Sequence, residues 1–365
     1  QDSSVKRTPL QSARQQLPWK KQKLLDIHQA LNSDPVDIET LRRAALSEGG
    51  LLTDDIRRKV WPKLLSINVY NLPAKPSKDV REDHKDYRQV VLDVRRSMRR
   101  FPKGMRVDER EVLQEQLIDI ILDVLRRNPQ LYYYQGYHDI VVTFLLVVGE
   151  RYIHFTRDTQ RNALKYSISH YNQSEVGTIF ALSWLITWYG YVLSDFRHVL
   201  RLYDFFLASH PLMAIYFAAV TVLYRQKEVK SSECDMASVH HLLSQMPQDL
   251  PYEELIGRAQ SLFISCPPSL LTQSAALQPH NIIAISTFTD FQTSTLRQRP
   301  DSVLRQQLHK RHENQLTLPM STQPANTNQL IKMAVWGLSA TLGAAALAVA
   351  QTAMDWAPEF LSQLF

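Results

Sequence analysis

The stretch VVLDVRRS contains the first residues whose types and spacing suggest chemistry. Val90, Asp93 and Arg96 are three residues apart, so on a helix they share a face and Asp93 can hold or orient Arg96. An arginine fixed by a carboxylate is suited to binding phosphate oxygens through two parallel hydrogen bonds. Because Arg95, Arg99 and Arg100 are also present, this segment taken alone favours a solvated basic face.

A second candidate is Gln135, in the stretch LYYYQGYHDI. Asn128-Pro129 is a typical helix stop and an apolar run begins at Ile140, so this glutamine is expected in a loop between two helices. The neighbouring tyrosines are expected to pack the turn, and Gly136 lets the backbone pass close to other atoms. Gln135 is then left pointing outward.

Other reactive side chains do not form a recognisable catalytic or metal site. His138 and Asp139 are adjacent, so they diverge on a helix and are expected to be structural. His240-His241 has no partner at ligand spacing, and Glu175 and Asp204 lack the matched carboxylate of a glycosidase pair. Since no glycine-rich phosphate loop occurs, the chain is not expected to bind nucleotide by itself.

Composition favours a helical protein facing a reducing compartment. The 365 residues are 44% hydrophobic and 21% charged, with a formal net charge of +6. Two distant cysteines exclude a disulfide framework and a cysteine-based zinc site. The positive charge permits an acidic partner, but nucleic acid is not the expected one. The arginines lack interleaved aromatic residues, and no nucleic-acid-binding module is recognisable.

Helical periodicity extends over residues 21–265 and predicts an all-α domain. One predicted helix lies in LTDDIRRKVWPKLL, where Thr53 is a suitable N-cap and apolar residues repeat every four positions. A second lies in DEREVLQEQLIDIILDVLRR, which is amphipathic, with acidic residues in its first turn and arginines in its last. Apolar patterns predict further helices at 140–148, 176–193, 202–224, 236–243 and 252–263. Residues 1–20 are expected to form a disordered basic arm, and residues 266–330, rich in Gln, Ser, Thr and Pro, a flexible linker.

The C-terminal segment is expected to anchor the chain in a membrane. Met333–Ala350 is an uncharged run of 18 residues, close to the about 20 that cross a bilayer core. We therefore expect a transmembrane helix over 331–350 and a short lumenal tail over 351–365. The residues before the helix are the more basic flank, so they and the large domain are expected in the cytosol. Another apolar stretch, 205–224, is interrupted by Pro211 and is expected to be a core helix instead.

Four motifs, taken in order, resemble those of the TBC-domain family of Rab GTPase-activating proteins. IRRKVWPKLL is similar to the opening motif of the family, with Arg57 four residues before Trp61. VVLDVRRS resembles IxxDxxR, with Val90 in place of isoleucine, and residues 133–136 match YxQG. RLYDFF resembles a later L-W-D-x-F element, with Tyr203 in place of tryptophan. The ordered set is much more specific than any single motif.

This resemblance implies a multi-helix Rab-GAP domain that supplies two residues to a Rab in its GTP state. Arg96 would be an arginine finger that neutralises charge on the transferred γ-phosphoryl group, and Gln135 a glutamine finger that positions the attacking water. The motifs assign supporting roles to Asp93, Tyr133, Gly136, Arg57 and Trp61. GTP and Mg²⁺ would be carried by the Rab, so no cofactor or metal is expected on this chain.

The resemblance also implies a location and a substrate class. The large domain would face the cytosol from the endoplasmic reticulum membrane or the early Golgi, and act on a Rab of ER-to-Golgi traffic. Between Arg151 and Ser174 the chain is shorter than the family pattern. Two functions therefore remain, a GTPase activator and a membrane-anchored Rab-binding scaffold with impaired or no catalysis.

Overall fold

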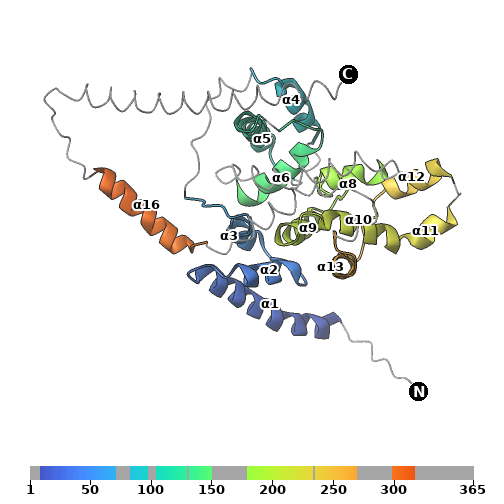
Figure 1. Ribbon diagram of the computed structural model, residues 1–365, viewed down its shortest axis with the longest axis horizontal. Coiled ribbons are helices and arrows are strands. Elements are labelled where there is room, and N and C mark those ends of the chain that lie inside the picture. The colour runs from blue at the N-terminus through green and yellow to red at the C-terminus, as the bar shows by residue number, and fades with distance from the viewer. Residues whose placement is uncertain are drawn as a thin grey trace, which may run out of the picture. The chain divides into compact units, whose positions relative to one another are not determined.

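A computed structural model describes residues 9–70, 83–97, 104–129, 131–149, 179–232, 235–268 and 298–316. Within these ranges all regular structure is helical, as predicted (Figure 1). The helices are α1 (Pro9–Asn32), α2 (Ile38–Leu46), α3 (Asp54–Leu64), α4 (Tyr87–Arg96), α5 (Val107–Arg127), α6 (Tyr137–Val148), the 3-10 helix η4 (Ile179–Ala181), α8 (Leu182–Ile186), α9 (Phe196–Ala208), α10 (Met213–Tyr224), α11 (Gln226–Ser231), α12 (Met236–Ser244), α13 (Tyr252–Ser265) and α16 (Asp301–Leu316). The chain divides into two units, Gln1–His309 and Lys310–Phe365, and only residues 310–316 of the second are described.

Several helix ends lie where the sequence predicts them. The side chain of Thr53 accepts a hydrogen bond from the Ile56 amide at 3.4 Å and so caps α3. The amphipathic helix α5 has acidic residues in its first turn and Arg126 and Arg127 in its last, as its dipole favours. At the N-terminus α1 begins at Pro9, within the segment expected to be a disordered arm. Proline is well tolerated in a first turn because its missing N–H would have no helical partner there.

Two predicted helices are wrong in their extent. The pattern over 176–193 gives only η4 and α8 among the described residues, because the chain turns at Trp188 and Tyr189, which have positive φ angles of 47° and 63°. The pattern over 202–224 belongs to two helices, α9 and α10, which are separated at Ser209–Leu212. At 188–189 tertiary packing of large side chains overrides local helix preference, whereas the break between α9 and α10 contains Pro211, which disfavours a continuous helix.

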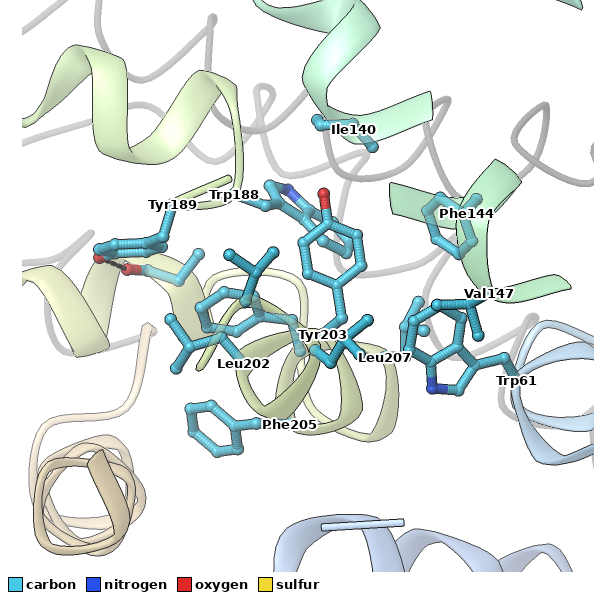
Figure 2. Packing of buried hydrophobic residues seen from close by; sticks show 14 of the residues in the cluster. Trp61, Ile140, Phe144, Val147, Trp188, Tyr189, Leu202, Tyr203, Phe205 and Leu207 are labelled. Carbon is cyan, nitrogen blue, oxygen red and sulfur yellow. Dashed lines mark hydrogen bonds between the residues drawn. The ribbon is translucent and has the colours of Figure 1, made fainter. Parts of the chain in front are cut away.

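The core is built around aromatic side chains from α3, α6, α9 and the turn after α8. Figure 2 shows Trp61, Phe144, Trp188 and Tyr203 converging, and the rings of Phe144 and Trp188 meet that of Tyr203 edge-on at 5.6 and 5.4 Å. The Tyr189 hydroxyl donates to the Ala214 carbonyl at 3.0 Å. These contacts explain the left-handed turn at 188–189 and place Trp188 and Tyr189 in the core.

The segment 298–301 packs against the helical domain, although it lies in the region predicted to be a flexible linker. The Val36 amide donates to the Gln298 carbonyl at 2.8 Å. Lys63, whose side chain is 2% exposed, donates to the Arg299 carbonyl at 2.9 Å and forms a 2.8 Å ion pair with Asp301. A buried ammonium group needs such oxygens, and the chain supplies them from far along the sequence.

We expect Asp301→Asn to lower the free energy of unfolding by about 1–2 kcal/mol, a value reduced for the partial exposure of Asp301. The reason is that the buried Lys63 ammonium loses its only charged partner within the described ranges. Thermal unfolding of the purified chain measures the change. The matched control is Asp34→Asn, which weakens the exposed Arg299–Asp34 pair. Equal effects of the two variants would show that the burial of Lys63 gives its ion pair no greater weight than the exposed pair has.

No helix within the described ranges is long and apolar enough to cross a membrane. The predicted transmembrane segment and lumenal tail, 331–365, lie outside these ranges, and so does the shortened segment 152–173. The stretch 205–224 is divided between α9 and α10, whose apolar side chains are largely buried in the domain. That burial agrees with the prediction of a core element there.

Candidate functional site

Arg96 and Gln135 both lie on the surface, at the ends of neighbouring elements. Arg96 is the last residue of α4, and Gln135 occupies the turn immediately before α6. Both side chains are exposed. Helices α4, α5 and α6 pack against one another, as Figure 1 shows, so the two residues belong to one part of the domain.

A partly buried hydrogen bond joins the helix that carries Arg96 to the turn that carries Gln135. The Tyr133 hydroxyl donates to Asp93 Oδ2 at 3.0 Å, and Gln89 Nε2 donates to the same oxygen at 3.1 Å. Burial, followed by the negative charge of Asp93, raises the pKa of Tyr133 far above its usual value, so the phenol keeps the proton that it donates. Asp93 therefore fixes the position of α4 relative to the turn.

The expected direct contact between Asp93 and Arg96 is not observed in the described part of the chain. Asp93 is 1% exposed and its carboxylate is directed into the domain, toward Tyr133 and Gln89. Arg96 lies at the exposed C-terminus of α4, where its charge interacts favourably with the helix dipole. Asp93 can thus position Arg96 only through the backbone of α4.

The other side of the turn is held against the end of α8. The Tyr134 hydroxyl donates to the Ile186 carbonyl at 3.0 Å. Gly136 has a φ angle of +105°, and a Cβ atom there would lie 2.9 Å from Thr187 Cγ2. Tyr133 and Tyr134 are thus tied to different helices while Gln135, which follows them, remains exposed.

We expect Gly136→Ala to destabilise the domain by about 1–3 kcal/mol, through its positive φ angle and the contact with Thr187. Thr187 cannot easily rotate its methyl group away, because its hydroxyl donates to the Ser183 carbonyl at 2.6 Å. Thermal unfolding measures the effect. Gly104→Ala is the matched control, since Gly104 has a φ angle of +86° and a methyl group added there would meet no atom within 4 Å. A loss no greater than that of the control would show that the close approach is unimportant.

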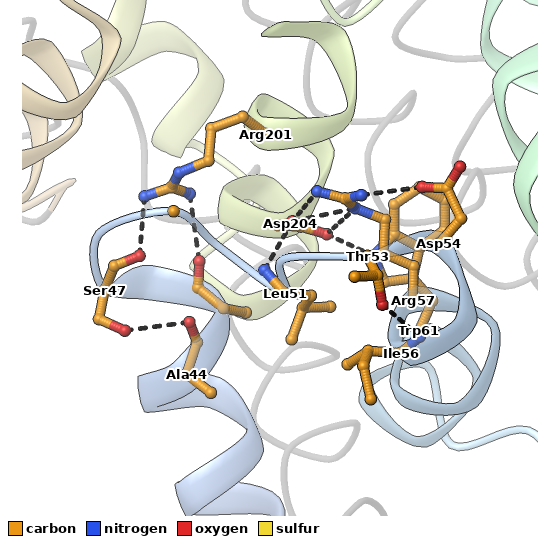
Figure 3. Close-up of polar contacts among 12 residues, drawn as sticks. Ala44, Ser47, Leu51, Thr53, Asp54, Ile56, Arg57, Trp61, Arg201 and Asp204 are labelled. Atoms are coloured by element: carbon orange, nitrogen blue, oxygen red, sulfur yellow. Dashed lines mark hydrogen bonds and ion pairs between the residues drawn. The ribbon is translucent and has the colours of Figure 1, made fainter. Parts of the chain in front are cut away.

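The first and last of the four motifs meet at a buried ion pair, drawn in Figure 3. Arg57 Nη2 lies 2.9 Å from Asp204 Oδ2, and its Nε lies 3.1 Å from both carboxylate oxygens. Trp61 Nε1 donates to Asp204 Oδ1 at 2.8 Å, and the Leu51 amide donates to Oδ2 at 2.9 Å. Arg57 and Trp61 therefore hold α9 against α3, which makes their supporting role structural.

Burial acts against the charged form of both partners of this ion pair, and their mutual attraction opposes it. Burial raises the pKa of Asp204 above its usual value, and the charge of Arg57 and the surrounding N–H groups offset only part of that rise. Burial lowers the pKa of Arg57, but the charge of Asp204 and hydrogen bonds to Asp204 and Asp54 outweigh it, so the net pKa is raised. Every group that contacts the carboxylate is a donor, so Asp204 is ionised at neutral pH.

Sequence reasoning missed two polar groups, one that joins helices of the domain and one beside the turn that carries Gln135. Arg201 is buried on α9 and donates to Glu253, to the Ala45 carbonyl in the last turn of α2 and to the Ser47 carbonyl just after it. Figure 3 shows its contact with Ser47. His138, expected to be merely structural, lies 3.3 Å from the Tyr133 hydroxyl through Nδ1. A charged or polar residue within an apolar helix pattern was the available signal in both cases.

Arg96 and Gln135 do not lie in the groove that the described residues form between α3, α9 and α13. Within the described ranges no three His, Cys, Asp or Glu side chains are arranged to hold a metal ion. A groove of about 730 Å³ lies between α3, α9 and α13, and its lining includes Arg57, Arg201 and Glu253 but no residue of α4 or α6. The site around Arg96 and Gln135 is therefore a surface, suited to a macromolecule more than to a small ligand.

Comparisons with known proteins agree with the order of the motifs. A family model described as the Rab-GTPase-TBC domain matches residues 54–160, a range that includes Arg96 and Gln135. TBC1 domain family member 20 of Homo sapiens is 58% identical over 376 aligned residues, covering 95% of this chain and 93% of that protein. The protein of the same name from Bos taurus is 57% identical over 375 residues, with the same coverage.

A more distant relative extends the similarity to fungi. GTPase-activating protein gyp10 of Schizosaccharomyces pombe is 27% identical over 274 residues, which cover 66% of this chain and 72% of that protein. In the alignment with the human relative, 376 positions cover only 95% of a 365-residue chain, so this chain is the shorter of the two within the aligned region. That difference is consistent with a segment shortened between Arg151 and Ser174.

Proposed function

Because this chain belongs to the TBC-domain family of Rab GTPase-activating proteins, we propose that it accelerates GTP hydrolysis by inserting Arg96 and Gln135 into the active site of a bound Rab. The observation that carries this proposal is the Tyr133–Asp93 hydrogen bond, at 3.0 Å. It fixes the element bearing Arg96 against the turn bearing Gln135 and leaves both side chains exposed. Two groups that act together on one phosphate need such a rigid mutual support.

The chemistry required of the two residues is positioning and charge neutralisation. The guanidinium of Arg96 would donate to oxygens of the γ-phosphoryl group, where negative charge develops during transfer. The amide of Gln135 would both accept from and donate to the attacking water, and so orient it toward phosphorus. GTP and Mg²⁺ would arrive with the Rab, so this chain would supply no cofactor of its own.

Exposed apolar side chains beside the two residues support a protein partner. Leu92 on α4 is 47% exposed, and Tyr132, next to the turn, is 75% exposed. Lys85 lies 4.7 Å over the ring of Tyr132, which limits the mobility of that ring. Exposed aromatic side chains such as Tyr132 are enriched at protein interfaces.

We further propose that the partner is a Rab of ER-to-Golgi traffic, and that the chain acts at the endoplasmic reticulum membrane or the early Golgi. Support comes from the uncharged run Met333–Ala350, which is long enough for a membrane anchor beyond the helical domain. The absence of Lys and Arg after this run favours a cytosolic domain and a lumenal tail.

The decisive experiment is single-turnover GTP hydrolysis by purified Rabs of the Rab-one class, with increasing concentrations of the full chain. If the chain is an activator, we expect the rate of hydrolysis to rise to a maximum as the chain is added, and the Rab to bind only transiently. The second candidate, a Rab-binding scaffold, is favoured by the shortened segment between Arg151 and Ser174. Binding of GTP-loaded Rab without any rise in rate would establish the scaffold and refute the activator.

A further inference from the structure

A series of polar groups, buried at Asp93 and His138 and half-buried at Tyr133, continues from α4 into α6. His138, which is 7% exposed, places Nδ1 3.3 Å from the Tyr133 hydroxyl. Its Nε2 lies 3.5 Å from Asp139 Oδ2, and Asp139 is 3% exposed. The polar groups therefore connect α4, the turn before α6, and α6 itself, beneath the surface that presents Arg96 and Gln135.

The donor and acceptor roles of these polar groups define the direction of the hydrogen bonds between them. The Tyr133 hydroxyl has one proton and donates it to Asp93. The same oxygen can then only accept from His138, so Nδ1 of the imidazole carries a proton. A hydroxyl that accepts one hydrogen bond while donating another is polarised, and both bonds are strengthened in a buried site. Loss of the imidazole would leave the Tyr133 hydroxyl with its bond to Asp93 alone, although its ring would still pack edge-on against Tyr137 of α6.

We propose that His138 is a positioning residue for GTPase activation, which holds Gln135 and Arg96 in register through Tyr133 and Asp93. This inference rests on the proposed function. His138 itself is buried and does not reach the phosphate, so its effect is on the placement of the two exposed residues. Misplacement of a reacting group by about 1 Å can reduce a rate by about 100-fold.

The test is single-turnover GTP hydrolysis by a Rab of the Rab-one class, with the wild-type chain, three single variants and one double variant titrated over a wide concentration range. His138→Leu removes the donor, whereas His138→Asn retains an N–H group near the position of Nδ1. Tyr133→Phe removes the hydroxyl through which His138 would act. Maximal rate, half-saturating concentration of the chain and thermal unfolding temperature are measured for each variant.

We expect His138→Leu to lower the maximal rate by about 10- to 100-fold with little change in half-saturating concentration. His138→Asn is expected to restore most of the rate, and the double variant His138→Leu, Tyr133→Phe to be no slower than Tyr133→Phe alone. A wild-type maximal rate in His138→Leu, whatever its unfolding temperature, would overturn the proposal, as would independent losses in the double variant. Absence of acceleration by the wild-type chain would refute the proposed function itself.

Discussion

We expect Arg96→Ala to reduce the maximal acceleration of GTP hydrolysis by about 10³- to 10⁵-fold, the range attributed to an arginine supplied to a GTPase in trans. Single-turnover assays with saturating chain measure this loss. Stability should change little, because Arg96 is exposed at the end of α4. Arg96→Lys should recover only part of the rate, since a lysine keeps the charge but loses the planar pair of donors.

The matched control for this prediction is Arg95→Ala. Arg95 is the preceding residue of α4, is equally exposed, and carries the same charge. Removing Arg95 tests whether hydrolysis depends on the general positive charge of this surface instead of on the single guanidinium of Arg96. A loss below tenfold in Arg96→Ala, or equal losses in both variants, would contradict the role of Arg96 as the finger.

The local elements of the site could be predicted from sequence because they depend on short-range rules. The cap at Thr53, the dipole pattern of α5 and the glycine at the turn before α6 all follow from the conformation or hydrogen bonding of neighbouring residues. The exposure of Gln135 could also be predicted. The tyrosines before it and the apolar helix after it are expected to pack into the domain, which leaves the glutamine side chain pointing outward. The order of the four motifs along the sequence indicated the TBC-domain family.

The partners of the polar side chains could not be predicted in the same way. Asp93 was expected to contact Arg96, three residues later, yet it bonds Tyr133, 40 residues away. Lys63 obtains its oxygens from residues 299 and 301, more than 230 positions later. Such contacts depend on tertiary packing, and helical spacing alone specifies which residues share a face, not which remote group meets them.

Asp204→Ala is expected to lower the free energy of unfolding by about 3–5 kcal/mol, the usual cost of removing one partner from a buried ion pair. Asp204 is 0% exposed and accepts from Arg57, Trp61 and the Leu51 amide. Its removal leaves the buried Arg57 charge without its main partner, and the two neutral donors unsatisfied. Thermal and urea unfolding of the purified chain measure the loss.

The matched control is Asp55→Ala, which breaks the Arg58–Asp55 pair at 2.7 Å on the exposed side of α3. Because Asp55 is 81% exposed, solvent already screens its charge and we expect a loss of no more than about 1 kcal/mol. The two substitutions are chemically identical and remove ion pairs of similar length. A difference between them therefore measures burial.

The double variant Arg57→Ala, Asp204→Ala distinguishes the loss of the pair from the cost of an orphaned charge. Removing Arg57 as well eliminates the unpaired guanidinium, so the double variant should be less destabilised than the sum of the single variants by about 1–3 kcal/mol. Strict additivity would mean that the two side chains do not interact energetically despite their 2.9 Å contact. A positive coupling would instead show that the first motif, with Arg57, and the last motif, with Asp204, act as one structural unit. This unit joins α3 to α9 and thereby supports the packing of α3 against α6.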